Sequence, residues 1–209
     1  MTVEPRRAVY RVETDRIVVR CWSPDDAKRL RAALDDSNDH LRPWIPWMKH
    51  EPRSLEATTQ WLRETRAKFD RDEDYRYAIF DPREETLIGE VALLTRAGAG
   101  AREIGYWINV ASAGRGYATE AAGAMVKVGF EIDRVTRIEI HCAVANAASA
   151  AVPLKLGFRH ETTLPRRLVA SDDTVHDVAI FTMFCNEYPG SRASTLRISA
   201  FDCAGERLG

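Results

Sequence analysis

Paired cysteine motifs and long apolar runs are missing from this chain. Its 209 residues include four scattered cysteines, Cys21, Cys142, Cys185 and Cys203, without the paired spacing of zinc or redox motifs. Three of them lie in apolar runs, which predicts buried thiols in a reducing cytoplasm. No apolar run reaches membrane-spanning length, and the first residues lack the apolar core of a signal peptide. We therefore expect a cytoplasmic protein with no metal site and no membrane contact.

An excess of positive charge is also missing. The chain has 30 Lys and Arg against 31 Asp and Glu, a net charge of −1. Because nucleic-acid binding relies on basic side chains that neutralise phosphates, this balance gives direct nucleic-acid binding no support. The 45% hydrophobic and 29% charged residues are ordinary for a globular protein. We expect one domain over 1–188. An extension over 189–209 then begins at Pro189 and Gly190. It could be an added edge strand, a partner-exchanged arm or a flexible tail, and we favour the strand.

Residues 104–130, IGYWINVASAGRGYATEAAGAMVKVGF, are the most informative stretch. A run of aromatic and β-branched residues predicts a strand, and apolar residues recurring every three or four positions after residue 116 predict a helix. The first amides of a helix have no internal partner, and the helix dipole favours negative charge there. Gly114 and Gly116 carry no Cβ, so a phosphate can approach the main chain. The pattern predicts an anion-binding loop, although a simple glycine-containing turn also accounts for it.

Two common phosphate loops are excluded by this sequence. A nucleotide P-loop needs a lysine that is absent here, and a dinucleotide fingerprint needs a third glycine where the chain has Thr119. The loop instead resembles the pyrophosphate loop of the GNAT N-acetyltransferases, Gln/Arg-x-x-Gly-x-Gly/Ala, with Ala113 to Ala118 in the corresponding positions. Ala113 replaces the usual Gln or Arg. This removes one side-chain contact but leaves the backbone amides.

A second block, residues 146–158 (NAASAAVPLKLGF), resembles the RimJ/RimL branch of the same superfamily. Pro153 occupies the place where many other GNAT enzymes carry a tyrosine acid. The Thr-x-Arg-Ile opening at 14–17, the Leu-x-Pro-Trp-Ile-Pro-Trp segment at 41–47 and the His176-Asp177 pair extend the similarity. The resemblance implies an α/β (α+β) GNAT fold, in which helices flank a strongly bent, mixed, mostly antiparallel sheet with a central V-shaped splay between two strands.

The same resemblance implies an acetyl-CoA-dependent transfer of an acetyl group to a primary amine by direct attack, without an acyl-enzyme. The expected acceptor is a protein N-terminal α-amine, of a ribosomal protein. An α-amine with a pKa of about 8 is partly neutral at pH 7, whereas a lysine amine near 10.4 is not. Two alternatives stay open: a small amine such as an antibiotic, polyamine or amino acid, and an acyl-CoA-binding module without turnover. A homodimer also stays open.

Site residues follow from the resemblance and from local chemistry. Ser149 is expected to give a proton to the coenzyme sulfur, although it also suits a helix N-cap. Glu161 is the first choice for the base and Glu103 the second, each directly or through a water, although both also suit ordinary surface positions on strands. The predicted acceptor pocket contains Trp44, Trp47, His40 and Tyr106, in a segment that also suits a lid packed on the core. The predicted coenzyme contacts are Asn109, Val110, Gly114, Arg115, Gly116, Tyr117, Ala118, Thr119, Asn146, Ser149 and Lys155.

The remaining elements follow from periodicity and from cap and turn residues. We expect helices capped by Ser23 and Ser54, the second running to Phe69, and a short helix beginning at Ser149 and ending at Gly157. We expect strands over 16–21, 75–80, 87–94, 103–110, 137–144, 158–164, 178–188 and 195–202.

Overall fold

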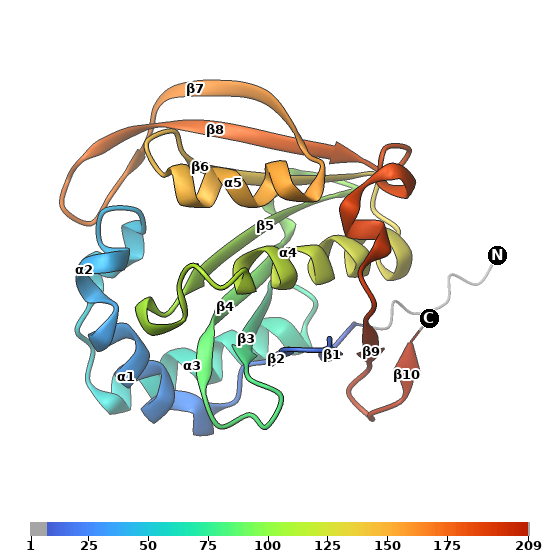
Figure 1. The fold of residues 1–209 in the computed structure, drawn as a ribbon. Coiled ribbons are helices and arrows are strands. Elements are labelled where there is room, and N and C mark those ends of the chain that lie inside the picture. Colours follow the sequence, from blue (N-terminus) through green and yellow to red (C-terminus); the bar gives the residue numbers. More distant parts are fainter. Residues whose placement is uncertain (1–7, 209) are drawn as a thin grey trace.

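A single mixed sheet forms the centre of the computed structural model, which describes residues 8–208 (Figure 1). Residues 1–7 of the predicted domain over 1–188 lie outside the described part. The strand order is β10-β9-β1-β2-β3-β4-β5-β6-β8-β7. The strands are β1 Arg11–Glu13, β2 Val18–Cys21, β3 Tyr75–Phe80, β4 Leu87–Leu94, β5 Ala101–Ile108, β6 Arg137–Ala143, β7 Arg159–Val169, β8 Val175–Phe184, β9 Ser199–Phe201 and β10 Arg207–Leu208.

Helices cover both faces of this sheet (Figure 1). They are α1 Ala27–Asp36, α2 Asn38–Leu41, α3 Leu55–Asp70, α4 Tyr117–Lys127 and α5 Ala147–Leu156. On one face, α1 and α3 pack over a core that contains Trp22, Leu62 and Trp107. On the other, α4 and α5 pack over a core that contains Met125 and Ile138. Successive strand residues point to opposite faces, so the four strands β2 to β5 contribute to both cores. Within residues 8–208, no helix combines the length and apolarity needed to cross a membrane.

The predicted caps explain where two helices begin. The Ser23 hydroxyl accepts from Asp25 N and begins the short 3-10 turn before α1, while the Ser54 hydroxyl accepts from Ala57 N, 3.1 Å away, at the start of α3. A hydroxyl in this position satisfies an amide that has no helical partner, which contributes about 1 kcal/mol. The sequence therefore located both helices correctly.

All strand pairs but one are antiparallel, and the exception is β5 with β6. These two strands pair only over residues 101–103 and 137–139, although β5 continues to Ile108 and β6 to Ala143. Beyond Glu103 they diverge. The expected mixed, mostly antiparallel sheet with a central splay is confirmed.

Some element boundaries were predicted wrongly. The strand predicted over 16–21 is present as β2, but it is the second strand, because the shorter β1 precedes it and pairs with it across a turn at 14–17. The helix predicted from Ser149 begins at Ala147, with Asn146 as its N-cap. Two of the four cysteines are exposed, Cys185 and Cys203, because both lie in chain turns after their strands end.

The extension after Gly190 joins the sheet. Its strand β9 pairs antiparallel with β1, Val12 opposite Ala200, and β10 folds back on β9. The strand is shorter than the predicted 195–202, because residues 192–195 form a 3-10 turn against α4. In Figure 1 this segment, drawn in red, descends past the end of α4 to the β1 edge of the sheet.

Candidate functional site

The divergence of β5 from β6 leaves main-chain donors facing a gap. The Asn109 N–H donates to the Ile88 carbonyl of β4, 2.8 Å away. Because N–H directions alternate along a strand, the Tyr106 and Ile108 amides point to the opposite side, toward β6. Over these residues β6 is no longer paired with β5. The opening therefore presents two amides suited to an extended ligand or to a carbonyl oxygen.

Asn109 and Val110, two of the predicted coenzyme contacts, follow directly after β5. Both amides form hydrogen bonds within the protein. Asn109 N donates to the Ile88 carbonyl, and Val110 N donates to the Ser37 hydroxyl, 3.1 Å away. The Asn109 side chain accepts from Ala111 N and so caps a 3-10 turn. These two amides are therefore not available to a carbonyl oxygen in the opening, because the chain has already turned away from β6 at these positions, and a contact of the two residues with the coenzyme stays a prediction.

The glycine-rich loop between β5 and α4 keeps its amides free. Within residues 8–208, the N–H groups of residues 114–119 form no hydrogen bond, while Glu120 N is the first to reach a helical carbonyl, that of Gly116. Gly114 and Gly116 adopt φ of +75° and +83°, which L side chains disfavour. Six adjacent free amides at the start of an eleven-residue helix suit a diphosphate.

The carboxylate nearest this loop is neutralised. Glu120, in the first turn of α4, accepts from the Thr14 hydroxyl at 2.6 Å and from Arg16 Nε at 2.7 Å. Arg16 also donates to the Arg115 carbonyl and lies over the Tyr117 ring. The pair fixes the turn between β1 and β2 beside the loop, and it removes a repulsion that an anionic ligand would otherwise meet. The Arg115 side chain is itself exposed.

Ser149 and Tyr106 meet across the splay. The Tyr106 hydroxyl donates to the Ser149 carbonyl at 2.9 Å and lies 3.2 Å from its Oγ. Ser149 N donates to Asn146 Oδ1, so the N-cap role that seemed an alternative for Ser149 belongs to Asn146. Burial raises the pKa of Tyr106 well above its usual 10. The pair thus holds two neutral hydroxyls between β5 and α5.

The two candidate bases lie in contrasting surroundings. Glu103 is buried, and both of its oxygens accept from Arg96, at 2.7 and 2.5 Å. It lies where β5 and β6 are still paired, with His141 Nδ1 3.7 Å away. Glu161 lies at a register shift of the edge strand β7 and is exposed, with no ion pair to another described residue. Glu161 can accept a proton without losing a partner, whereas Glu103 would have to release Arg96.

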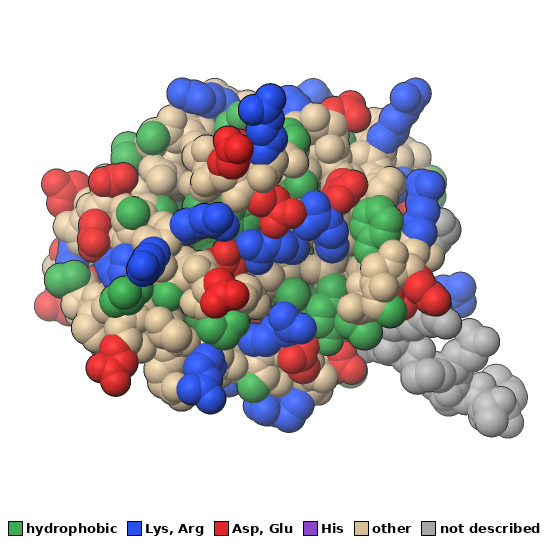
Figure 2. Space-filling model, turned by 90° about the horizontal axis from the view of Figure 1, so that it is seen from below, with side chains coloured by type: hydrophobic (Ala, Val, Ile, Leu, Met, Phe, Trp, Pro, Cys, Tyr) green, Lys and Arg blue, Asp and Glu red, His purple; other side chains and the backbone are tan. Residues whose placement is uncertain are grey.

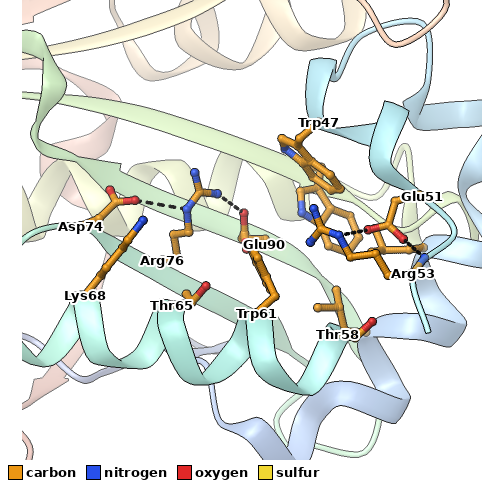
Figure 3. A pocket seen from close by; sticks show the side chains of 13 residues that line it. Trp47, Glu51, Arg53, Thr58, Trp61, Thr65, Lys68, Asp74, Arg76 and Glu90 are labelled. Carbon is orange, nitrogen blue, oxygen red and sulfur yellow. Dashed lines mark hydrogen bonds and ion pairs between the residues drawn. The ribbon is translucent and has the colours of Figure 1, made fainter. Parts of the chain in front are cut away.

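The opposite face of the sheet holds a cavity of about 210 Å³, walled by α1, α3 and the segment before α3 (Figure 3). Trp47 and Trp61 lie on its wall, and Trp107 of β5 lines it as well. In Figure 3, Glu51 points toward Arg53 at one end, and Arg76 extends between Asp74 and Glu90 at the other. The cavity therefore combines indole surfaces with charges already arranged in pairs.

Glu90 is the residue that sequence reasoning missed. It is fully buried and accepts from Trp22 Nε1 at 2.8 Å and from Arg76 at 2.9 Å. Burial raises the pKa of Glu90, while the Arg76 guanidinium opposes that rise. A lone glutamate inside the apolar run LIGEVALL was the available signal, because charged residues are rarely buried without a purpose.

The predicted acceptor residues do not lie together. Trp47 lines the cavity, and Tyr106 lies at the splay. Trp44 instead stacks on His176, with ring centroids 5.5 Å apart, and His40 is exposed at the end of α2. His176 in turn contacts the Pro43 carbonyl, which ties this segment to β8. The expected single aromatic wall is therefore split between a cavity and a lid contact.

Charge on the surface is mixed. Figure 2 shows Lys and Arg side chains interspersed with Asp and Glu side chains over the face seen from below. No group of three or more His, Cys, Asp and Glu among the described residues is arranged to hold a metal ion.

Comparison with known proteins agrees with this geometry. A family model described as an acetyltransferase (GNAT) domain matches residues 16–159. The chain is 27% identical over 156 residues to the ribosomal protein uS5-alanine N-acetyltransferase of Escherichia coli (strain K12), covering 72% of this chain and 79% of that protein. It is 28% identical over 186 residues to the N-acetyltransferase YdaF of Bacillus subtilis (strain 168), covering 85% and 96%.

A likeness in fold alone comes from a solved structure. The microcin C7 self-immunity acetyltransferase MccE, in complex with acetyl-CoA and AMP, superposes with a TM-score of 0.75 at 17% identity. The match covers 82% of this chain and 93% of that chain.

Proposed function

This chain belongs to the GNAT acetyltransferase family and is an acetyl-CoA-dependent N-acetyltransferase. On that premise we propose that it acetylates the N-terminal α-amine of a ribosomal protein. One observation carries the proposal: free loop amides lie at the start of α4, and an aromatic cavity lies on the other face of the sheet, with Trp107 of the diverging strand β5 in its wall. Donor and acceptor can thus approach the splay from opposite faces.

The donor fits the loop and the splay. The amides of residues 114–119 hold the diphosphate, with Arg115 and Thr119 beside it. The pantetheine arm enters between β5 and β6 as an extended segment, where Asn146 has its side-chain nitrogen left for a hydrogen bond, since only its oxygen caps α5. The Tyr106 and Ile108 amides then face the thioester carbonyl and stabilise negative charge on its oxygen.

The reaction needs one bond formed and one broken. The amine nitrogen attacks the thioester carbonyl carbon, the carbon–sulfur bond breaks, and the sulfur takes a proton from the Ser149 hydroxyl. The amine loses its proton to Glu161 through water, because the exposed Glu161 carboxylate has no ion pair with another residue in the described part of the chain. Ser149 regains its proton from solvent or from the neighbouring Tyr106 hydroxyl, 3.2 Å away.

The acceptor class rests on two supports. The Escherichia coli relative is named as a ribosomal protein uS5-alanine N-acetyltransferase. A larger fraction of an α-amine than of a lysine amine is neutral at pH 7, so an α-amine depends less on a base in the enzyme. This suits a site whose buried carboxylates Glu90 and Glu103 are already ion-paired. A small-molecule amine is the competing acceptor.

A peptide panel separates the acceptors. Thiol release from acetyl-CoA is measured with peptides bearing the N-termini of ribosomal proteins, with the same peptides blocked at the α-amine but carrying an internal lysine, and with small amines. Turnover with free N-termini alone supports the proposal. Turnover with small amines alone overturns the protein acceptor while leaving the acetyltransferase activity intact.

A further inference from the structure

The C-terminal extension forms one wall of a groove beside the coenzyme loop. The groove measures about 730 Å³ and begins at Gly116 and Thr119, the residues proposed to hold the diphosphate. Its far wall is the segment from Arg192 to Arg197, which lies beyond residue 159, where the family match ends. Leu196 of this segment would be 3.4 Å from a Cβ on Gly123 of α4, so the wall packs closely on the helix.

Basic side chains dominate the groove. Lys155, Arg192 and Arg197 line it, are exposed, and form no ion pair or side-chain hydrogen bond with another residue in 8–208. The acidic residues lining it are Asp15 and Glu120, and Glu120 is already held by Arg16. Three cations therefore remain against one exposed carboxylate, which makes the groove a local exception in a chain of net charge −1.

We propose that Arg192 and Arg197, with Lys155, bind the 3′-phosphate on the adenosine end of acetyl-CoA. This inference rests on the proposed donor site, since the groove continues from the loop that holds the diphosphate. A phosphate monoester carries close to two negative charges, and arginine guanidinium groups bind it through paired N–H bonds. The extension thus serves coenzyme recognition in addition to lengthening the sheet.

The position of the two arginines is fixed on both sides. Before them, the Ser191 hydroxyl caps the 3-10 turn that begins at Arg192, and between them the Ser194 carbonyl accepts from Lys127 of α4 at 3.3 Å. After them, β9 pairs with β1. Because the main chain is anchored at both ends, only the two arginine side chains have to become ordered when they bind a phosphate, so the strand pairing contributes to coenzyme affinity.

The test compares two donors that differ only in the 3′-phosphate. Dissociation constants for acetyl-CoA and for 3′-dephospho-acetyl-CoA are measured by calorimetry on the full chain and on Arg192→Gln/Arg197→Gln. We expect the double variant to bind acetyl-CoA about tenfold more weakly, because it loses charge-assisted hydrogen bonds to the 3′-phosphate. Its dissociation constant for 3′-dephospho-acetyl-CoA should be unchanged. The unaltered protein should prefer acetyl-CoA by a similar factor.

Arg207→Gln is the matched control, because Arg207 is an exposed arginine of the same extension outside this groove. It should leave both constants unchanged. Equal weakening of both donors in the double variant, or unchanged acetyl-CoA binding, overturns the inference. Neither result affects the proposed function, which fails separately if the unaltered protein neither binds acetyl-CoA nor releases thiol.

Discussion

Replacement of Ser149 by alanine tests the chemical step. The substitution removes one hydroxyl but keeps the Ser149 carbonyl that accepts from Tyr106 and the amide that Asn146 caps. The lost contact is the 3.2 Å approach between the two hydroxyls. Folding should therefore change by about 1 kcal/mol or less, the usual worth of one hydrogen bond.

The effect on turnover should be much larger. A positioned proton donor contributes roughly 10²- to 10⁴-fold, or about 3 to 5 kcal/mol of transition-state stabilisation. Ser149→Ala should lower kcat by at least about a hundredfold, while the acetyl-CoA dissociation constant stays within roughly a factor of two, because the lost interaction acts only in the transition state. Thiol release and calorimetry measure the two quantities on the same preparation.

Tyr106→Phe supplies the comparison. Its hydroxyl is neutral throughout the assay range, because burial raises the pKa of Tyr106 well above 10. If Ser149 is the donor, Tyr106→Phe loses a positioning bond and falls less steeply than Ser149→Ala. A Ser149→Ala enzyme with half or more of the original kcat would refute the assignment, and a greater loss in Tyr106→Phe would transfer the role to the tyrosine.

Three further predictions concern the loop, the cavity and the buried ion pair. Gly116→Val should weaken acetyl-CoA binding at least about tenfold in calorimetry, since a side chain at φ +83° costs roughly 1–2 kcal/mol and crowds the amides; an unaltered constant contradicts the loop assignment. Trp47→Ala should raise the KM for the peptide and leave the affinity for acetyl-CoA unchanged, whereas Trp44→Ala should not change this KM. The same change in KM in both variants would show that the cavity does not bind the acceptor. Arg76→Ala removes the cation that opposes the raised pKa of Glu90, so this pKa rises further and stability is lost as pH rises through it. The substitution should cost about 3 kcal/mol of stability because it leaves a buried carboxyl without its cation, and the melting temperature should fall more at pH 8 than at pH 5. Adding Glu90→Gln should remove the pH dependence. A loss of stability in Arg76→Ala that is the same at both pH values would contradict the role given to Glu90.

Local signals explain why much of the fold could be predicted. Serine caps, turn residues and helical periodicity depend on a few neighbouring residues, so Ser54 and the glycine-rich loop located α3 and the start of α4. The splay itself was predicted from the family resemblance, because the departure of β5 from β6 depends on contacts between distant segments.

Features made by distant residues were missed for the same reason. The cavity joins Trp47, Trp107 and the Arg76–Glu90 pair, which come from separate elements and share no sequence spacing. The N-cap of α5 was misplaced by three residues because Asn146 and Ser149 are both good caps, and only the folded chain shows which oxygen accepts. Strand β1 was missed because a three-residue strand has too little alternation to detect.

The central claim is that the amides of residues 114–119 bind the donor's diphosphate. Titration of uniformly ¹⁵N-labelled protein with coenzyme A, followed by amide chemical shifts, tests it residue by residue. We predict that the amides of residues 114–119 show the largest shifts, while the Asn109 and Val110 amides, which are bonded within the protein, shift less. Saturable coenzyme binding that leaves the amides of residues 114–119 unmoved would contradict the account.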